Sequence, residues 1–370
     1  MTTITCRQSV TTLIVPLVLA GCLATADGAE LWLHPKCKPL PTQRQGPFVR
    51  LPDGGILGVD VTQAVISRDE GKTWETHPIF KPGQDFVVSR ERAIVCTKKG
   101  TVIVGFMNYK EKVWKWNAAK RDADPGTKLP TYIVRSTDGG KTWLAPQKLH
   151  DAWTGDARDM IQTASGQVIF SSMNLLNNPG RHSVLTYTSG DDGKTWTRSN
   201  TIDLGGNGHH GGAIEATFEQ LRDGRIWMLI RTNWERFWEA FSLDEGRSWR
   251  IIRPSEIPAS SSPGLLKRLA SGRLVLIWNR PLPEGKTDYP RIGGKGQFSE
   301  VPVRNHRGEL SIMFSEDDGK TWSKPVVFAR KPGTSLAYPH IFEVKPGVLW
   351  VTTMQGNIRV ILHEADFLTR

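Results

Sequence analysis

Two charged residues stand in apolar segments, where a charge needs a partner. Glu215 lies in the strand-like run Ala-Ile-Glu-Ala-Thr-Phe, and a buried carboxylate requires an opposite charge or hydrogen-bond donors. Arg231 ends the next apolar run, Ile-Trp-Met-Leu-Ile-Arg. These two residues could form an ordinary structural pair, or they could belong to a site that holds a polar ligand.

A second group of chemically capable residues lies in the loop-like segment 109–126. Asp122 and Asp124 follow closely on Trp114 and Trp116 in this segment. The aspartates could exchange protons with a ligand, or they could be solvated loop charges. The indole rings could stack on the face of a sugar or form a lid.

Signatures of several other chemistries are missing from the sequence. It holds no phosphate-cradling glycine loop, nucleophile elbow or dinucleotide fingerprint. No third ligand follows His209 and His210 at a recognisable spacing, so we expect neither a metal nor a cofactor. The net charge of +11 favours an anionic ligand, but no basic stripe suggests nucleic acid. Acidic glycans are the expected partners.

An eight-residue segment that begins with Ser and ends with Trp occurs five times. The copies are residues 67–74, 136–143, 189–196, 242–249 and 315–322. In each copy the Ser and Asp side chains can bond nearby backbone, a glycine can take the left-handed conformation, and the Trp can anchor the returning strand. The pattern indicates a structural hairpin turn on an outer rim.

Alternating, strand-like segments precede each of these turns. Three strands, a turn and a fourth strand form a unit typical of a propeller blade, which is stable only against its neighbours. We therefore predict an all-β fold, a six-bladed β-propeller of four-stranded antiparallel blades, with five or seven blades as alternatives. The predicted blades are residues 46–85, 86–150, 156–205, 212–256, 262–330 and 337–370. Since the last blade lacks the turn, the tail at 23–45 is expected to supply its outer strand.

The N-terminus resembles an export signal. Residues 1–22 contain an apolar run that is too short to span a bilayer. Leu19-Ala20-Gly21-Cys22 resembles a lipobox, which would attach a lipid anchor at Cys22, whereas Ala24-Thr25-Ala26 would suit an ordinary signal peptidase. We expect an exported monomer that is periplasmic, secreted or held at the cell surface. There Cys37 and Cys96 could pair or remain thiols.

The repeated turns resemble the Asp boxes of sialidases (neuraminidases), and other motifs extend this resemblance over nearly the whole of residues 46–370. The segment from Gly211 to Arg231 is similar to the family's glutamate, Leu-x-Asp-Gly turn and arginine. The segments around Arg307 and Tyr338 are similar to its later arginine and its tyrosine. The resemblance implies that Tyr338 is a nucleophile that Glu215 assists, and that Arg231 and Arg307 bind the substrate carboxylate. Arg291 and Arg304 are alternatives to Arg307.

The first arginine of the resemblance lies in a less regular match. Phe86-Val-Val-Ser-Arg90-Glu91-Arg92 resembles the family's Phe-Arg-Ile-Pro segment, with Glu-Arg in place of Ile-Pro. Arg90 is the first candidate and Arg92 the second, and Arg50 in Phe-Val-Arg-Leu-Pro is a rival match.

The catalytic acid and base is expected in the loop after this arginine. Asp124 is preferred, because Pro125 and Gly126 give it a turn, and Asp122 is the alternative. Trp116 could contact the sugar. Arg158, which opens the third blade together with Asp156 and Asp159, is a further candidate contact for the substrate.

These observations favour an exported exo-sialidase or sialidase-like glycoside hydrolase that forms a glycosyl-tyrosine intermediate and retains configuration. A neutral phenol suits a sugar whose anomeric carbon carries a carboxylate, because that carboxylate would repel an acidic nucleophile. Two alternatives are a non-catalytic propeller that binds anionic glycans or envelope proteins, and a propeller lyase acting on uronic-acid polysaccharide. A cluster of Tyr338, Glu215 and an aspartate would favour hydrolysis.

Overall fold

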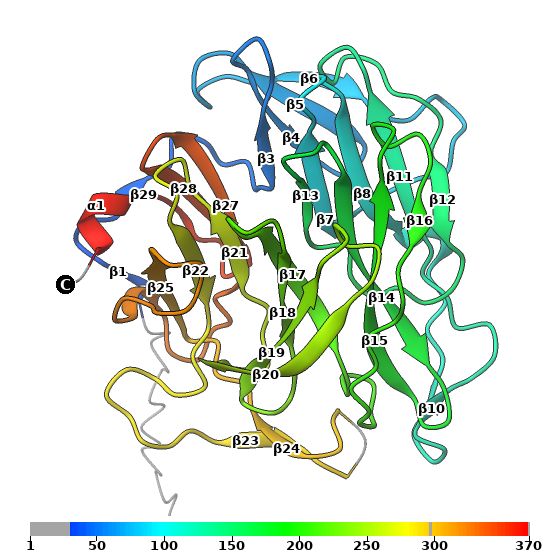
Figure 1. Cartoon of the computed structure of the whole chain (residues 1–370), viewed down its shortest axis with the longest axis vertical. Coiled ribbons are helices and arrows are strands. Elements are labelled where there is room, and N and C mark those ends of the chain that lie inside the picture. The colour runs from blue at the N-terminus through cyan, green and yellow to red at the C-terminus, as the bar shows by residue number, and fades with distance from the viewer. Residues whose placement is uncertain (1–29, 296–297, 369–370) are drawn as a thin grey trace, which may run out of the picture.

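A computed structural model describes residues 30–295 and 298–368, and it confirms the predicted six-bladed β-propeller (Figure 1). Six antiparallel sheets, each with four blade strands, stand in a ring. Innermost strands of neighbouring blades contact one another around the axis, and between blades three and four it is the second and third strands of blade three that contact the innermost strand of blade four. No helix in the described part of the chain is long and apolar enough to cross a membrane.

The four strands of each blade are ordered from the axis of the ring to its outer edge. In this order, blades one and two contain β3 (Phe48–Arg50), β4 (Ile56–Val59), β5 (Gln63–Ser67) and β6 (Glu75–Pro78), then β7 (Val88–Cys96), β8 (Val102–Asn108), β11 (Thr131–Ser136) and β12 (Gln147–His150). Blades three and four contain β13 (Met160–Gln162), β14 (Val168–Leu176), β15 (Arg181–Ser189) and β16 (Thr197–Arg198), then β17 (Ile214–Gln220), β18 (Ile226–Arg231), β19 (Arg236–Ser242) and β20 (Arg250–Pro258). Blades five and six contain β21 (Leu265–Arg268), β22 (Leu274–Trp278), β25 (Glu309–Ser315) and β26 (Val326–Arg330), then β27 (Ala337–Lys345), β28 (Val348–Gln355), β29 (Arg359–His363) and β2 (Lys38–Pro39).

Segments outside the blades complete the fold. Two short hairpins extend from one end of the ring, β9 (Trp116–Asn117) with β10 (Asp122–Ala123), and β23 (Arg291–Gly293) with β24 (Pro302–Arg304) (Figure 1). A single 3-10 turn, Tyr109–Glu111, follows β8, and a short helix α1 (Glu364–Phe367) follows β29.

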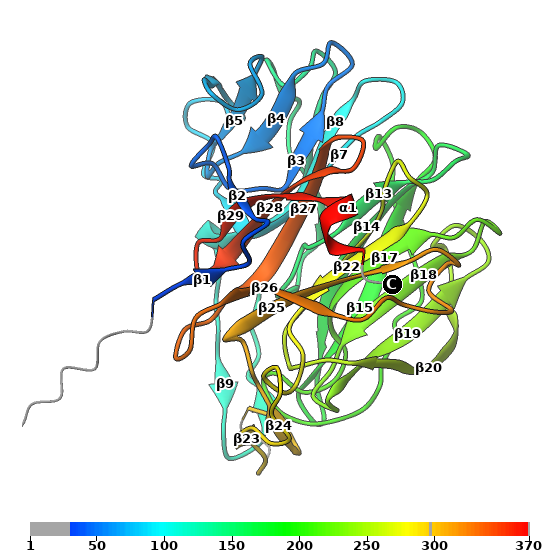
Figure 2. The same cartoon turned by 90° about the vertical axis from the view of Figure 1, so that its left-hand side faces the viewer.

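The N-terminal segment joins the last two blades. β1 (Trp32–Leu33) pairs with β26 as a fifth strand of blade five, and β2 pairs with β29 as the outer strand of blade six. Figure 2 shows these first strands beside the last ones. Cys37 packs against the core of blades five and six, whereas Cys96 packs against that of blades one and two, so the two cysteines are unpaired. The predicted signal peptide and Cys22 lie outside the described residues.

Each of the five repeated turns is closed by its own side chains. In the second copy, Asp138 accepts hydrogen bonds from Ser136 Oγ at 2.8 Å and from the Thr142 amide at 2.9 Å. Ser136 Oγ in turn accepts from the Gly140 amide, and the indole of Trp143 donates to the Gly140 carbonyl.

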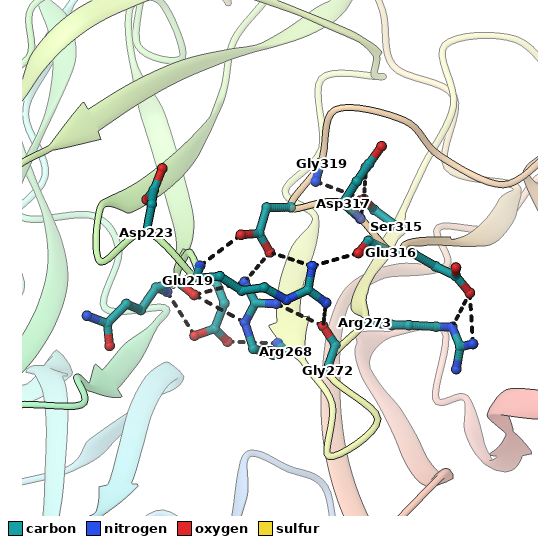
Figure 3. Close-up of polar contacts among 12 residues, drawn as sticks. Glu219, Asp223, Arg268, Gly272, Arg273, Ser315, Glu316, Asp317 and Gly319 are labelled. Atoms are coloured by element: carbon teal, nitrogen blue, oxygen red, sulfur yellow. Dashed lines mark hydrogen bonds and ion pairs between the residues drawn. The ribbon is translucent and has the colours of Figure 1, made fainter.

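The turns also join neighbouring blades. The central glycine of each turn has a positive φ and lies against a side chain of the preceding blade, namely Trp350, Leu57, Ile103, Ile169 and Trp227 in chain order. Polar contacts strengthen such a junction between blades four and five (Figure 3). There the Arg268 amide donates to Glu219 of the neighbouring blade at 2.8 Å, close to the turn that contains Ser315 and Asp317.

Candidate active site

Irregular backbone on three inner strands places the central side chains. A bulge in β17 lies between Ile214 and Ala216, so that Glu215 takes a left-handed φ of 38°. Tyr338, near the start of β27, has a φ of 60°. The register of β7 shifts between Val88 and Arg92. Such conformations are uncommon for residues other than glycine, and they persist only where the surroundings hold them.

The core of the site is a contact between Tyr338, Glu215 and Arg231. The Tyr338 hydroxyl donates to Glu215 Oε1 at 2.8 Å, and Arg231 Nη1 donates to the other carboxylate oxygen, Oε2. The same guanidinium nitrogen lies 3.5 Å from the phenol oxygen. All three side chains are buried. The structure therefore joins blades four and six through one phenol and one ion pair.

The electrostatics of this contact set the resting protonation states of the phenol and the carboxylate. Burial alone would raise the pKa of Glu215, but the Arg231 charge and the hydrogen bonds to Arg231 and Tyr338 leave it below its usual value. Burial, followed by the charge of Glu215, raises the pKa of Tyr338 above its usual value. At neutral pH the phenol is protonated and the carboxylate is free to accept its proton.

Two further arginines lie against the phenol ring. The guanidinium carbons of Arg158 and Arg307 are 5.4 Å and 5.6 Å from the Tyr338 ring centroid, within cation–π range. Arg158 is anchored by the Pro339 carbonyl at 2.9 Å. Arg307 donates to the Ser261 carbonyl at 2.7 Å and to Gln355 at 3.1 Å.

Arg90 reaches the same region from blade two. Its Nη2 donates at 2.7 Å to the carbonyl of Met354, a residue that packs on Tyr338. Arg92 is instead buried, and its Nη1 donates to the Ser89 carbonyl at 3.3 Å.

The remaining candidate arginines have partners away from Tyr338. Arg50 donates to the carbonyls of Gly54 and Val344. Arg291 and Arg304 both pair with Glu235. The arginines that the structure brings towards the phenol are therefore Arg90, Arg158, Arg231 and Arg307.

The hydrogen bonds and ion pairs of the two loop aspartates in the described residues are made with the hairpin and with blade three. Asp122 accepts from Asn177 Nδ2 at 2.8 Å and from the Asn178 amide at 2.9 Å, because hairpin β9–β10 docks on the β14–β15 loop of blade three. Asp124 lies 3.9 Å from Lys120 Nζ. In the described residues no hydrogen bond or ion pair links either aspartate to Tyr338 or Glu215.

Three residues that no sequence motif marks as catalytic lie close to the site. Tyr109 donates its hydroxyl to Glu91 Oε2 at 3.1 Å. Asp156 is 0% exposed, and neither of its carboxylate oxygens has a hydrogen-bond partner among the described residues. Burial and the charge of Glu215 raise the pKa of Asp156 well above its usual value. A signal for Glu91 existed in the sequence, since it replaces the isoleucine of the Phe-Arg-Ile-Pro pattern.

Aromatic rings line the approach to Glu215. A cavity of about 330 Å³ is bounded by Glu215, Lys112 and a wall of rings that includes Trp114, Trp153, His209 and His210. The centroids of Trp114 and Trp153 are 4.3 Å apart. Trp116 stacks on Trp114 and meets His209 edge-on, so it supports this wall from behind.

Comparisons with known proteins agree with the fold and place the chain in a family. Residues 59–351 match the family model of the BNR repeat-like domain. A sialidase of Micromonospora viridifaciens is 23% identical over 90% of this chain and 55% of its own length. A sialidase of Trypanosoma cruzi is 25% identical over 70% of this chain and 25% of its own length. The chain thus spans about half, or less, of the length of these relatives.

A solved structure shows the same architecture. The NanB sialidase from Streptococcus pneumoniae, in its K499G mutant form, superposes with a TM-score of 0.58 at 15% identity, over 92% of this chain and 71% of that one. This likeness extends to the ring of blades. Because the family model spans four of the six blades in full and parts of the other two, the chain belongs to the family of BNR repeat-like domains.

Proposed function

We propose that this protein is a sialidase-like glycoside hydrolase that removes a terminal sialic acid or a related acidic sugar with retention of configuration. The observation that carries the proposal is the 2.8 Å hydrogen bond from the Tyr338 hydroxyl to Glu215. A nucleophile held by a base, with the base oriented by a third group, is the arrangement that nucleophilic catalysis needs. Arg231 is that third group.

The proposed first step forms a bond between the Tyr338 oxygen and the anomeric carbon. The phenol proton moves to Glu215, while the bond from the anomeric carbon to the departing oxygen breaks and that oxygen takes a proton from an acid. In the second step water attacks the anomeric carbon and gives a proton back to that acid, the bond from the carbon to the tyrosine oxygen breaks, and the Glu215 proton returns to the tyrosine. Two displacements at one carbon retain its configuration.

The positive side chains support this chemistry in two ways. The phenol oxygen gains negative charge as it loses its proton, and Arg231 lies 3.5 Å from it. Arg307 and Arg90 are less buried than Arg231, so they are better placed to receive the substrate carboxylate. Arginine suits this task because its planar fork matches a carboxylate. The names of the relatives also support a sialylated glycan as substrate.

The proposal includes export from the cytoplasm. It rests on the apolar run in residues 1–22, which precedes the described residues. Export would bring the protein to glycans outside the cell.

The test is release of 4-methylumbelliferone from its α-sialoside by the wild type and by Tyr338→Phe. We expect the variant to lose about 10³-fold or more in kcat, because it lacks the nucleophile. Tyr187→Phe is the matched control, since that tyrosine is also buried and its hydroxyl lies 3.1 Å from His150. Folded wild-type protein without turnover of this or other acidic glycosides would refute the proposal, as would an active Tyr338→Phe variant.

A further inference from the structure

The inner strand of blade two carries an acid that the site needs. We propose that Glu91 is the catalytic acid and base, held in place by Tyr109. This inference rests on the proposed function and names the group that protonates the departing oxygen.

The need for such a group follows from the loop aspartates. Asp122 has both carboxylate oxygens occupied by Asn177 and the Asn178 amide, and Asp124 stands near Lys120. A proton donor must lie within hydrogen-bond reach of the departing oxygen. Among the described residues the hydrogen bonds and ion pairs of both aspartates are made with the hairpin and with blade three, and none is made with Tyr338 or Glu215.

The geometry of β7 brings Glu91 to the site. The register shift between Val88 and Arg92 contains both Arg90, which donates to the Met354 carbonyl beside Tyr338, and Glu91. Tyr109 then fixes the Glu91 carboxyl through a hydrogen bond of 3.1 Å to Oε2. No hydrogen bond from another described residue reaches the other oxygen, Oε1, which is left for a ligand.

Exposure distinguishes Glu91 from the other acid nearby. Glu91 is half-buried, whereas Asp156 is fully buried and beyond the reach of a departing group. An acid that must meet a substrate in one step and water in the next has to remain accessible. We therefore assign the role to Glu91 and not to Asp156.

The charges around Glu91 favour a carboxyl that keeps its proton. Burial, then the charge of Glu215, raises the pKa of Glu91 above its usual value, although hydrogen bonds from its own backbone and from Tyr109, and the charge of Arg158, oppose this. The remaining charged or titratable groups that interact with Glu91 are Asp156, Tyr338 and Arg92. Glu215 and Glu91 thus have pKa values shifted in opposite directions, as an acid and a base in one site require.

The proton balance closes over both steps. As the bond between the anomeric carbon and the departing oxygen breaks, the Glu91 proton moves to that oxygen and leaves a carboxylate. Water then attacks the anomeric carbon, its proton moves to Glu91, and the tyrosine leaves as the phenol with the proton from Glu215. Both carboxyl groups end as they began.

The experiment compares two α-sialosides that differ in how much their departing group needs a proton. 4-Methylumbelliferone leaves readily as an anion, whereas the lactose of sialyllactose does not. We expect Glu91→Gln to lower kcat/KM for sialyllactose by about 10²–10⁴-fold and to lower it far less for the aryl substrate. Asp124→Asn is the matched control and should leave both values near those of the wild type.

Two more variants keep the test decisive. Glu91→Asp retains a carboxyl group and should recover part of the lost sialyllactose turnover. Tyr109→Phe removes the bond that lowers the pKa of Glu91, so we expect the basic limb of the pH profile to move upwards.

The inference fails if Glu91→Gln affects both substrates equally or neither. It also fails if Asp124→Asn shows the dependence on the departing group. A wild type without activity would instead refute the proposed function, so the two failures are distinguishable.

Discussion

Replacing Glu215 with glutamine should destabilise the protein by the cost of a buried, unpaired arginine. The amide keeps the size of the carboxyl and can still accept from Tyr338, but it carries no charge. Arg231 would then remain in the core, where its side chain is 1% exposed, beside a residue that is 7% exposed. The substitution therefore removes the negative charge of the ion pair and keeps the size of the side chain.

The magnitude follows from the burial of both partners. Removing one partner of a buried ion pair costs about 3–5 kcal/mol. With an unfolding entropy of about 2.1 cal/mol/K per residue over the 370 residues, this corresponds to a fall in Tm of about 4–6 °C. We expect this shift in thermal unfolding near pH 7.

Glu239→Gln is the matched control. Glu239 is buried to a similar degree on a strand of the same blade, but its partner Arg253 is 61% exposed. Water can solvate that arginine when its partner is lost, so the cost should stay below about 1 kcal/mol. Equal shifts for both variants would refute the reasoning. The reasoning would also be refuted if the Glu215→Gln, Arg231→Met double variant lost as much stability as the two single variants together. Two contacting residues should couple, so the double variant should lose less than that sum.

The Tm difference between the wild type and Glu215→Gln should depend on pH, and the sign follows from the pKa of Glu215. The pKa of Glu215 is lowered in the folded protein, so its stabilising contribution is fully present above the unfolded pKa of about 4.3. It is lost as the pH falls through the lower, folded value. The Tm gap between the wild type and Glu215→Gln should be constant from about pH 7 to 5 and should shrink only below about pH 4.

Two further predictions concern the repeated turns and the arginines. Gly140→Ala should cost about 2–5 kcal/mol, because the new Cβ would lie 2.2 Å from Leu57 Cδ1 at a φ of +89°, whereas Gly126→Ala has open space and should cost only about 1–2 kcal/mol. Urea unfolding measures both, and equal costs would contradict the packing argument. Arg307→Met should raise KM for the sialoside by about 10–100-fold with a smaller change in kcat, since charge-assisted hydrogen bonds contribute about 1.5–3 kcal/mol. A fall in kcat alone, seen in steady-state kinetics, would exclude carboxylate binding by this residue.

The fold could be predicted because its signals are local. Each repeated turn contains its own donors and acceptors, as Ser136 and Asp138 show, so eight residues suffice to identify it. Glu215 and Arg231 lie on adjacent strands, and the apolar sequence around each one indicates a buried pair. The contact of Tyr338 with Glu215 crosses the ring, and only the resemblance to a known family suggested it.

The rest of the site depends on contacts that spacing does not reveal. Asp122 is held by Asn177 of another blade, which no pattern in the loop indicates. The sequence does not mark Glu91 as catalytic, because its position corresponds to an apolar residue in the matching pattern. Its role depends on a register shift in β7 and on Tyr109, and both are properties of the folded chain.

The balance of charge around Tyr338 links binding to catalysis. Four arginines surround three acids in this region, and the acids are Glu91, Asp156 and Glu215. Because the pKa values of Glu91 and Asp156 are raised, both acids carry less negative charge than free side chains would at the same pH. The site then has excess positive charge, which in the proposed mechanism favours an anionic sugar and the negative charge that develops on the phenol. When Glu91 loses its proton as the pH rises, the proposed catalytic acid is lost, and when Asp156 loses its proton, the new negative charge offsets the charge of an arginine. These two titrations should therefore weaken substrate binding and slow the first chemical step together.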